Sequence, residues 1–264
     1  MDENNFTTLS QRFVVPGVQA MALMGSFARG EAGRFSDVDV VRFGGDAAAA
    51  PFPLAGSHLL AGRLVVVSDV TPEQVARWFT EPDEAVNSIA GVRSARVLWD
   101  PDGVLAAIQA RALAFVWDEV MQAKADHWAS EQMVGLIEEV HKGLTGLERD
   151  DMGRLLNARF GLSWLLNRVM AVAKGVLLSG DNGFWAEVAA AVGPDSLWVQ
   201  VRSRAFGVNS VDGVPPSLRQ QVEAGLHLYV LTAERLAPVL SAETLPLVQA
   251  TVALIEGEGF TVKT

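Results

Sequence analysis

Short apolar runs alternate with turn-forming residues over the first 100 residues of the chain. The pattern predicts buried strands over Val18–Gly25, Ser36–Phe43, Gly62–Val70 and Ser94–Asp100. Residues 44–57 are rich in Gly, Pro and Ala, which is typical of a loop. A helix is expected after Thr71, because Thr71 is a good N-cap and Pro72 suits the first helical position. This part of the chain is therefore predicted to mix strands and helices.

The pattern changes near residue 100, where apolar residues begin to recur at helical spacing. We expect an α+β chain with a small mixed α/β domain over residues 1–100 and an all-α helical bundle over residues 101–264. The stretch LSGDNGF, residues 178–184, interrupts the helical pattern. A turn is the simplest interpretation of it, although Asp181 or Asn182 could cap a helix.

Composition and charge narrow the class of protein. Half of the 264 residues are hydrophobic, which is enough for a sizeable core, and the absence of cysteine excludes disulfides and thiolate metal sites. The first residues are acidic and polar, and no apolar run approaches the ~18 residues of a membrane span. We therefore expect a cytoplasmic protein that binds no membrane. The net charge of −10 argues against a nucleic-acid partner and favours a small or cationic one.

Two carboxylates lie in the second predicted strand, where apolar residues are expected. Residues i and i+2 of a strand point to the same face, so Asp37 and Asp39 are side by side while Val38 and Val40 face the core. Two such charges repel each other, and a divalent cation removes the repulsion. Mg²⁺ is commonly held by one or two carboxylates together with substrate phosphates. Asp37 and Asp39 are therefore predicted metal ligands.

A Gly-Ser pair precedes these aspartates, at the end of the first predicted strand. Gly25 lets the backbone approach a phosphate, and the N–H groups at a helix start attract anions. Arg29 and Arg34 add positive charge for phosphate oxygens. A Gly-Ser or an Asp-x-Asp alone is more often a turn or a solvated face, but the combination indicates a metal-assisted site for a nucleoside triphosphate.

The stretch GSFARGEAGRFSDVDVV, residues 25–41, resembles the signature of the DNA polymerase β-type nucleotidyltransferase superfamily. Its Ala-Arg-Gly and Ser-Asp-x-Asp details resemble the aminoglycoside and lincosamide nucleotidyltransferase branch. The resemblance implies that Gly25 and Ser26 lie at the nucleotide phosphates, with Ser36 among the nucleotide-binding residues. It implies that Asp37 and Asp39 bind Mg²⁺. The implied activity is transfer of a nucleoside monophosphate, with ATP as the expected donor, to a hydroxyl of a small acceptor, with release of pyrophosphate.

The family often carries a third carboxylate on a later strand, as a metal ligand or as the base for the attacking hydroxyl. Asp69 is the acid in the third predicted strand, and we expect it to be catalytic together with Asp37 and Asp39. Alternatively, Asp69 starts the turn into the next helix, whereas Glu73 fits the first turn of that helix. If neither serves, the base comes from the helical part, or activity is weak or lost.

The densest polar region of the helical part lies around residues 138–159. Lys142 is a candidate to bind the triphosphate there. The alternative is a solvated helix face, with an i,i+4 pair between Glu138 and Lys142 and an acidic N-cap at Asp150 and Asp151. For any single residue this structural interpretation is favoured.

Other functions remain open at this level. The acceptor could be a side chain of a partner protein, as in toxin–antitoxin systems, or the protein could bind a nucleotide for regulation without catalysis. A template-independent RNA polymerase fits less well, because the chain lacks a basic stripe. The sequence leaves open the acceptor, the NTP and whether the protein is a monomer or a homodimer.

Overall fold

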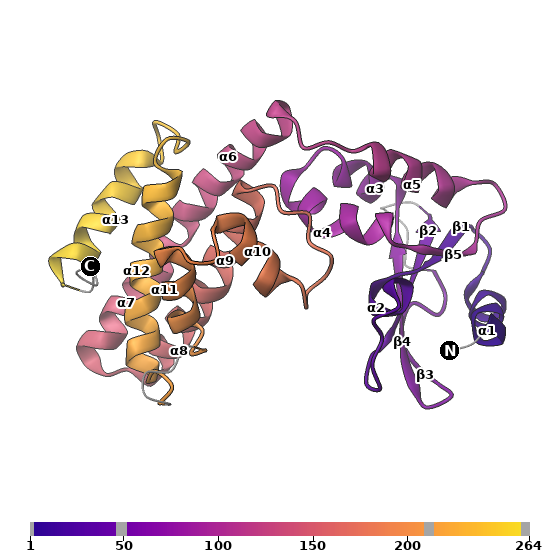
Figure 1. Ribbon diagram of the computed structural model, residues 1–264, viewed down its shortest axis with the longest axis horizontal. Coiled ribbons are helices and arrows are strands. Elements are labelled where there is room, and N and C mark those ends of the chain that lie inside the picture. The colour runs from indigo at the N-terminus through magenta and orange to yellow at the C-terminus, as the bar shows by residue number, and fades with distance from the viewer. Residues whose placement is uncertain (1–2, 46–51, 209–213, 260–264) are drawn as a thin grey trace. The chain divides into compact units, whose positions relative to one another are not determined.

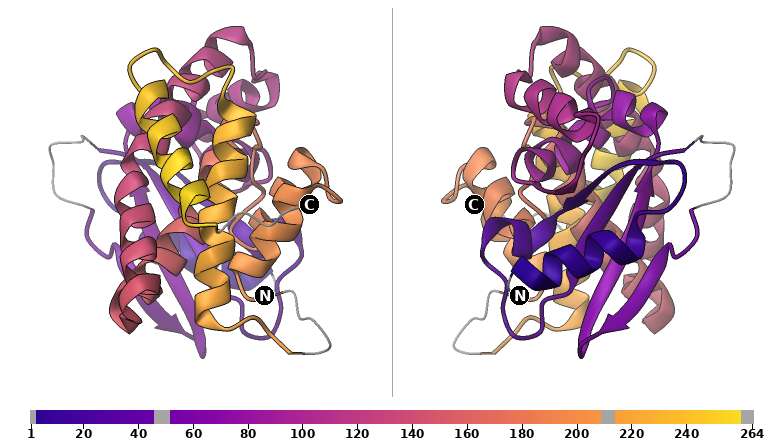
Figure 2. Two further views of the ribbon diagram at one scale, coloured as in Figure 1. Left: turned by 90° about the vertical axis from the view of Figure 1, so that its left-hand side faces the viewer. Right: turned by 90° about the vertical axis from the view of Figure 1, so that its right-hand side faces the viewer.

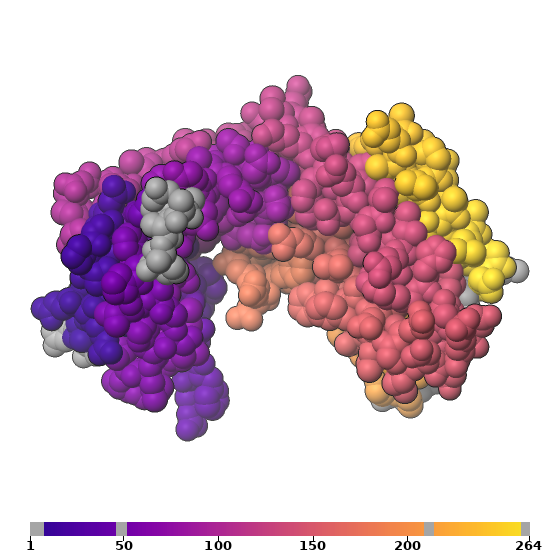
Figure 3. Space-filling view, turned by 180° about the vertical axis from the view of Figure 1, so that it is seen from behind, coloured from indigo at the N-terminus to yellow at the C-terminus, as the bar shows by residue number. Residues whose placement is uncertain are grey.

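The computed structural model describes residues 3–45, 52–208 and 214–259. The chain forms two compact units (Figure 1). The first unit holds residues 1–117 together with 177–183, and the second, which we call the helical unit, holds residues 118–176 and 184–264. In the space-filling view the first unit is mostly the indigo to purple body, and the helical unit is mostly pink to yellow (Figure 3). The α+β fold class predicted from the sequence is confirmed.

A five-stranded mixed sheet forms the centre of the first unit, in the order β3-β4-β2-β1-β5. Its strands are β1 (Val18–Leu23), β2 (Val38–Gly44), β3 (Gly56–Leu60), β4 (Arg63–Val70) and β5 (Arg96–Trp99). Strands β2 and β4 run parallel, and the other neighbours are antiparallel. The four predicted strands are confirmed as β1, β2, β4 and β5.

Strand β3 corrects the prediction of a loop over residues 44–57, because Gly56 and Ser57 already belong to it. It pairs with β4 in a hairpin whose turn is formed by Ala61 and Gly62, both with positive φ, 48° and 77°. Two successive residues with positive φ are the mark of a tight hairpin turn, which matches the twist of the flanking strands. Residues 46–51 of the predicted loop lie outside the described residues.

One face of the sheet carries a hydrophobic core cluster. Helix α1 (Glu3–Phe13) lies across this face (Figure 2), where Leu9 and Phe13 pack in one cluster with apolar side chains of β1, β2 and β4. The strand residues in the cluster are Met21, Leu23, Val38, Val40, Val65 and Val67. Phe27 of the short helix α2 (Gly25–Arg29) packs against the same cluster. Valines 38 and 40 therefore face the core, as the sequence predicts.

The remaining helices of the first unit are α3 (Pro72–Trp78), α4 (Pro82–Arg93) and α5 (Val104–Ala114). The predicted start of α3 is confirmed: the Thr71 side chain accepts from the backbone N–H of Gln74, and Pro72 occupies the first turn. The Trp78 ring packs edge-on against Phe43, with centroids 6.2 Å apart. Phe43 alternates with the core-facing residues of β2, so α3 contributes to the opposite face of the sheet.

The helical unit contains α-helices and one turn of π-helix, η1 (Gly161–Leu165). Its α-helices are α6 (Glu119–Gly135), α7 (Ile137–Arg149), α8 (Met152–Phe160), α9 (Leu166–Ala173), α10 (Phe184–Val192), α11 (Leu197–Ala205), α12 (Leu218–Leu236) and α13 (Leu245–Gly257). In its core the Trp198 indole N–H donates to Thr232 and the Tyr229 hydroxyl to the Met133 carbonyl. None of the described helices is long and apolar enough to cross a membrane.

Candidate functional site

The candidate site begins where β1 ends and the chain turns into α2. The N–H of Met24 donates to the carbonyl of Asp39, 2.8 Å away, which fixes the end of β1 beside β2. Gly25 then opens α2 with a φ of +63°, in the left-handed region. A Cβ atom at this position would overlap Oδ2 of Asp39. A glycine is required here both by the backbone conformation and by the carboxylate that lies against it.

The two predicted metal ligands lie at the start of β2. Asp37 precedes the first residue of the strand, Asp39 is its second residue, and both are half-buried. Burial raises the pKa of Asp39, as do the nearby charges of Asp37 and Asp181, whereas Arg29 lowers that pKa. The carboxylate pair is therefore costly without a counter-charge, and its oxygen atoms suit a hard divalent cation such as Mg²⁺.

Among the described residues, Asp37 and Asp39 are not part of a larger cluster of possible metal ligands. In the part of the chain that the structure describes, no group of three or more His, Cys, Asp or Glu residues could hold a metal ion. A cation held by Asp37 and Asp39 would therefore take its other ligands from water and substrate phosphates. Mg²⁺ is commonly bound in this way.

Arg29 brings positive charge to this pair. Its Nε donates to the Glu31 carboxylate and its Nη1 to the carbonyl of Ser179, both at 2.8 Å. The two contacts hold the guanidinium in place, and its charge acts on Asp39. The structure thus brings the charge of Arg29 to bear on Asp39, and the predicted role of Arg29 in nucleotide binding stays a prediction.

Arg34 and Ser36 lie in the loop between α2 and β2. The Ser36 hydroxyl accepts from the N–H of Gly33, 2.9 Å away, and Arg34 extends over the ring of Phe35, 5.1 Å from its centroid. These contacts shape the loop that leads into Asp37. The predicted roles of Arg34 and Ser36 in nucleotide binding stay predictions.

Asp69 lies on the other face of the sheet. In the parallel register of β2 and β4, Asp69 is opposite Arg42, whereas Asp39 is opposite Val66. Directly paired residues share a face, and faces alternate along a strand, so Asp69 and Asp39 point to opposite sides. The residues of β4 that share the face of Asp39 are Leu64, Val66, Ser68 and Val70, none of which is acidic. The structure does not bring Asp69 together with the predicted metal ligands.

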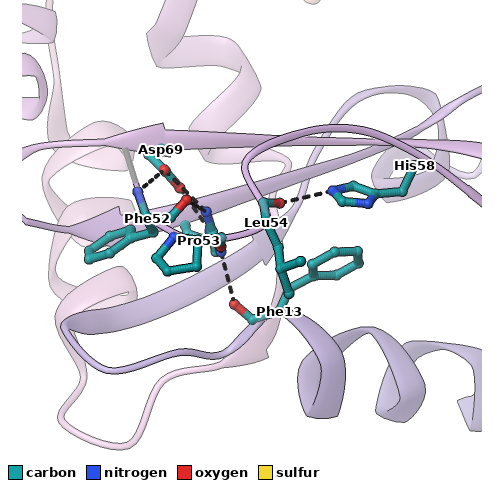
Figure 4. Close-up of polar contacts among 7 residues, drawn as sticks. Phe13, Phe52, Pro53, Leu54, His58 and Asp69 are labelled. Carbon is teal, nitrogen blue, oxygen red and sulfur yellow. Dashed lines mark hydrogen bonds and ion pairs between the residues drawn. The ribbon is translucent and has the colours of Figure 1, made fainter. Parts of the chain in front are cut away.

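Asp69 instead pairs with a buried arginine (Figure 4). Arg42 is fully buried, and its Nε and Nη2 donate to the two carboxylate oxygens of Asp69 at 2.7 and 3.1 Å. Asp69 also accepts from the N–H of Phe52, and Arg42 donates to the carbonyls of Phe13, Phe52 and Pro53. The pair thus ties the end of α1 and the segment before β3 to the sheet.

Lys142 lies in the helical unit, where its Nζ contacts Glu138 at 2.9 Å and Glu139 at 2.8 Å. The hydrogen bonds to Glu139 and Glu138 raise the pKa of Lys142. Asp151 caps α8 by accepting from the N–H of Arg154, as the sequence suggests. The i,i+4 pair favoured by the structural interpretation is present, and a contact of Lys142 with the triphosphate stays a prediction.

Asp181 acts electrostatically on the candidate site, and sequence reasoning did not assign it there. It lies in the segment 177–183, which belongs to the first unit although the residues on both sides belong to the helical unit. Its charge acts on Asp39. Glycines around it signal a turn in the sequence, but no local pattern indicates where that turn docks.

Replacement of Asp69 tests its assignment to the core. We expect Asp69→Asn to lower the free energy of unfolding by about 3 kcal/mol, because the variant leaves the buried Arg42 without its counter-charge. Urea denaturation measures the change. Asp102→Asn, in an exposed turn of the same unit, is the control and should change stability by less than about 0.5 kcal/mol. An unchanged stability of the Asp69 variant would contradict the structural role.

Replacement of Asp39 tests the electrostatic cost of burying its carboxylate beside Asp37. Because the pKa of Asp39 is raised on folding, its contribution to stability is full below the ordinary carboxyl pKa and is lost as the pH rises through the raised one. Asp39→Asn should therefore melt at a higher temperature than the wild type at pH 7 without divalent cations, and the difference should shrink in acid. Mg²⁺ should stabilise the wild type and not the variant. Calorimetry at pH 4 and pH 7 measures the two melting temperatures. A variant that melts below the wild type at pH 7 would contradict the electrostatic cost assigned to Asp39.

Comparison with known proteins finds one family model that matches the segment around this site. Residues 6–59 match the family model described as a nucleotidyltransferase domain, and the matched range includes Gly25, Ser26, Asp37 and Asp39. No match was found among the curated proteins that were compared.

A solved structure described as a nucleotidyltransferase-like protein from Exiguobacterium sibiricum 255-15 is 14% identical to this chain. The alignment covers 97% of this chain and 79% of that one, with a TM-score of 0.49. The match to the family model alone makes residues 6–59, which carry Gly25, Asp37 and Asp39, similar in sequence to nucleotidyltransferase domains.

Proposed function

We propose that the protein transfers a nucleoside monophosphate, with ATP as the expected donor, to a hydroxyl group of a small acceptor. The observation that carries the proposal is the packing of the Asp39 carboxylate, with Asp37 beside it, against the glycine that opens α2. This arrangement lies within the residues that are similar to nucleotidyltransferase domains.

The start of α2 is the expected place of the triphosphate. Gly25 has no side chain to keep a phosphate away, and the first N–H groups of a helix have no partner within the helix. The Ser26 hydroxyl adds a further donor beside them. Arg29 presents a charged guanidinium, two of whose donors are used by Glu31 and Ser179. These groups would bind and orient the phosphate oxygens.

Asp37 and Asp39 would hold the divalent cation. Their repulsion and the burial of Asp39 both favour binding a positive charge at this position. When bound, Mg²⁺ supplies positive charge that neutralises the phosphate oxygens and the charge that develops as pyrophosphate departs. The protein's contribution is to fix the two carboxylates, through the Met24–Asp39 backbone contact and the close approach of Gly25.

The acceptor is expected to be small and hydroxylated, such as an aminoglycoside- or lincosamide-like compound. The net charge of −10 gives the chain an acidic surface, which attracts cations at long range. A polycationic acceptor suits this field better than a nucleic acid does.

A second candidate, nucleotide binding without catalysis, is favoured by one observation. Asp69 lies on the face of the sheet away from Asp39, and Val66 and Ser68 take the site face of β4. A site that has the carboxylate pair for a cation but no proton acceptor would bind an NTP and turn it over slowly. The experiment below separates the two candidates.

The test is a transfer assay with Mg²⁺, each of the four NTPs in turn, and a panel of aminoglycosides, lincosamides and candidate protein acceptors. We expect pyrophosphate release and an acceptor that gains the mass of one nucleoside monophosphate. Asp37→Asn and Asp39→Asn should each lower the rate at least about 100-fold, because each removes a ligand of the cation. Asp102→Asn is the control with the same loss of charge at an exposed position of the first unit.

The outcomes separate the candidates. A protein that binds ATP in the presence of Mg²⁺ but releases no pyrophosphate would support the non-catalytic candidate. A mass gain on a protein in the panel would assign the acceptor to that class. Full activity in the Asp37→Asn, Asp39→Asn double variant would contradict the metal site itself.

A further inference from the structure

Transfer to a hydroxyl group requires a group that accepts the hydroxyl proton. In the proposed site Asp37 and Asp39 are taken up by the cation, and Asp69 lies on the other face of the sheet, paired with Arg42. A carboxylate is a common proton acceptor in such reactions. The proposed function therefore needs a carboxylate to accept the proton, and β2 and β4 do not supply a further one on the face of Asp39.

The segment 177–183 adds residues to the first unit from between two helices of the helical unit, α9 and α10. It is held at two points. The N–H of Leu178 donates to the carbonyl of Val86 in α4 at 2.9 Å, and the Ser179 carbonyl accepts from Nη1 of Arg29 in α2 at 2.8 Å. Backbone contacts to two separate helices make this segment a fixed part of the first unit.

Asp181 lies at the tip of this segment. The N–H of Gly183 donates to the carbonyl of Gly180 at 3.0 Å, so the chain makes a tight turn with Asp181 and Asn182 exposed at its end. Arg29, which holds the segment through Ser179, also acts on Asp39. The turn thus docks on the same guanidinium whose charge acts on Asp39.

Two facts define what Asp181 can do there. Its charge reaches Asp39, where it raises the pKa after the larger effects of burial and of Asp37. Yet it forms no three-residue metal group with Asp37 and Asp39, since the described residues contain no such group. Asp181 is therefore an exposed carboxylate whose charge acts on Asp39, in a turn docked on Arg29, and it is open to an incoming acceptor.

We propose that Asp181 is the catalytic residue that accepts the proton of the acceptor hydroxyl, an assignment that rests on the proposed transfer. In this step the acceptor oxygen forms a bond to the α-phosphorus, and the bond from that phosphorus to the bridging oxygen of the β-phosphate breaks. Pyrophosphate leaves with the electron pair, and the hydroxyl proton passes to the Asp181 carboxylate and from there to water. No other reactant is needed.

The test compares the full chain with Asp181→Asn, Asp181→Glu and Asp195→Asn. The last variant removes the same charge from an exposed position of the helical unit. Calorimetry measures binding of α,β-methylene-ATP with Mg²⁺, and a single-turnover assay measures AMP and pyrophosphate formation from ATP with water as the acceptor. We expect Asp181→Asn to bind the analogue within about twofold of wild type but to react about 10²–10⁴-fold more slowly. Asp181→Glu should recover part of the rate, and Asp195→Asn should match the wild type.

The contrary outcomes are distinct. A wild-type rate in Asp181→Asn would overturn the assignment while leaving the transfer itself intact. Loss of analogue binding in Asp181→Asn, in parallel with the rate, would also overturn it, because the residue would then act on the nucleotide rather than on the proton. A wild type that binds the analogue but forms no AMP with water and adds no nucleotide to any acceptor of the panel would refute the proposed transfer and, with it, the role of Asp181.

Discussion

The candidate site depends on one close approach, that of the Asp39 carboxylate to the backbone of Gly25. Any side chain at residue 25 would overlap the carboxylate, and the positive φ of this residue further restricts the position to glycine. The approach sets the turn from β1 into α2, the position of the first helical N–H groups and the place of Arg29 four residues later. A carboxylate that is partly buried against a backbone turn and beside a second carboxylate is unfavourable alone. This cost is what a bound cation would relieve.

Asp69 and Asp39 lie on opposite faces of the sheet, and only Asp39 belongs to the proposed catalytic site. On the core face, Asp69 neutralises the buried Arg42, and the pair organises the backbone around Phe52. On the other face, Asp39 stands with Arg29 and the Asp181 turn. The alternation of side chains along β2 and β4 is sufficient to assign each acid to its side. A third carboxylate for the site therefore has to come from outside β2 and β4, and we propose Asp181 of the segment 177–183.

Much of this arrangement could be predicted from local sequence. Apolar runs gave four of the five strands, Thr71 and Pro72 marked the start of α3, and the i,i+2 spacing placed Asp37 and Asp39 together. Strand β3 and the docking of Asp181 were not predictable in this way. Strand β3 is short and mostly exposed and gains its hydrogen bonds from β4. The turn that carries Asp181 is docked through hydrogen bonds of Leu178 and Ser179 to Val86 and to the Arg29 side chain, which are distant in sequence. The face of Asp69 could have been predicted only with the register of β2 against β4, because alternation alone does not fix it.

The nucleotide and metal site at the contact of Gly25 with Asp39 is tested most directly by Mg²⁺-dependent binding of α,β-methylene-ATP. The measurement compares the Gly25→Ala variant with the Gly30→Ala variant. Both glycines have positive φ, +63° and +76°, but a Cβ at residue 30 meets nothing within 4 Å, whereas one at residue 25 meets the Asp39 carboxylate. The account predicts that Gly25→Ala loses binding while Gly30→Ala retains it, with both variants folded. Equal binding by the two variants would contradict a nucleotide and metal site at the contact between Gly25 and Asp39.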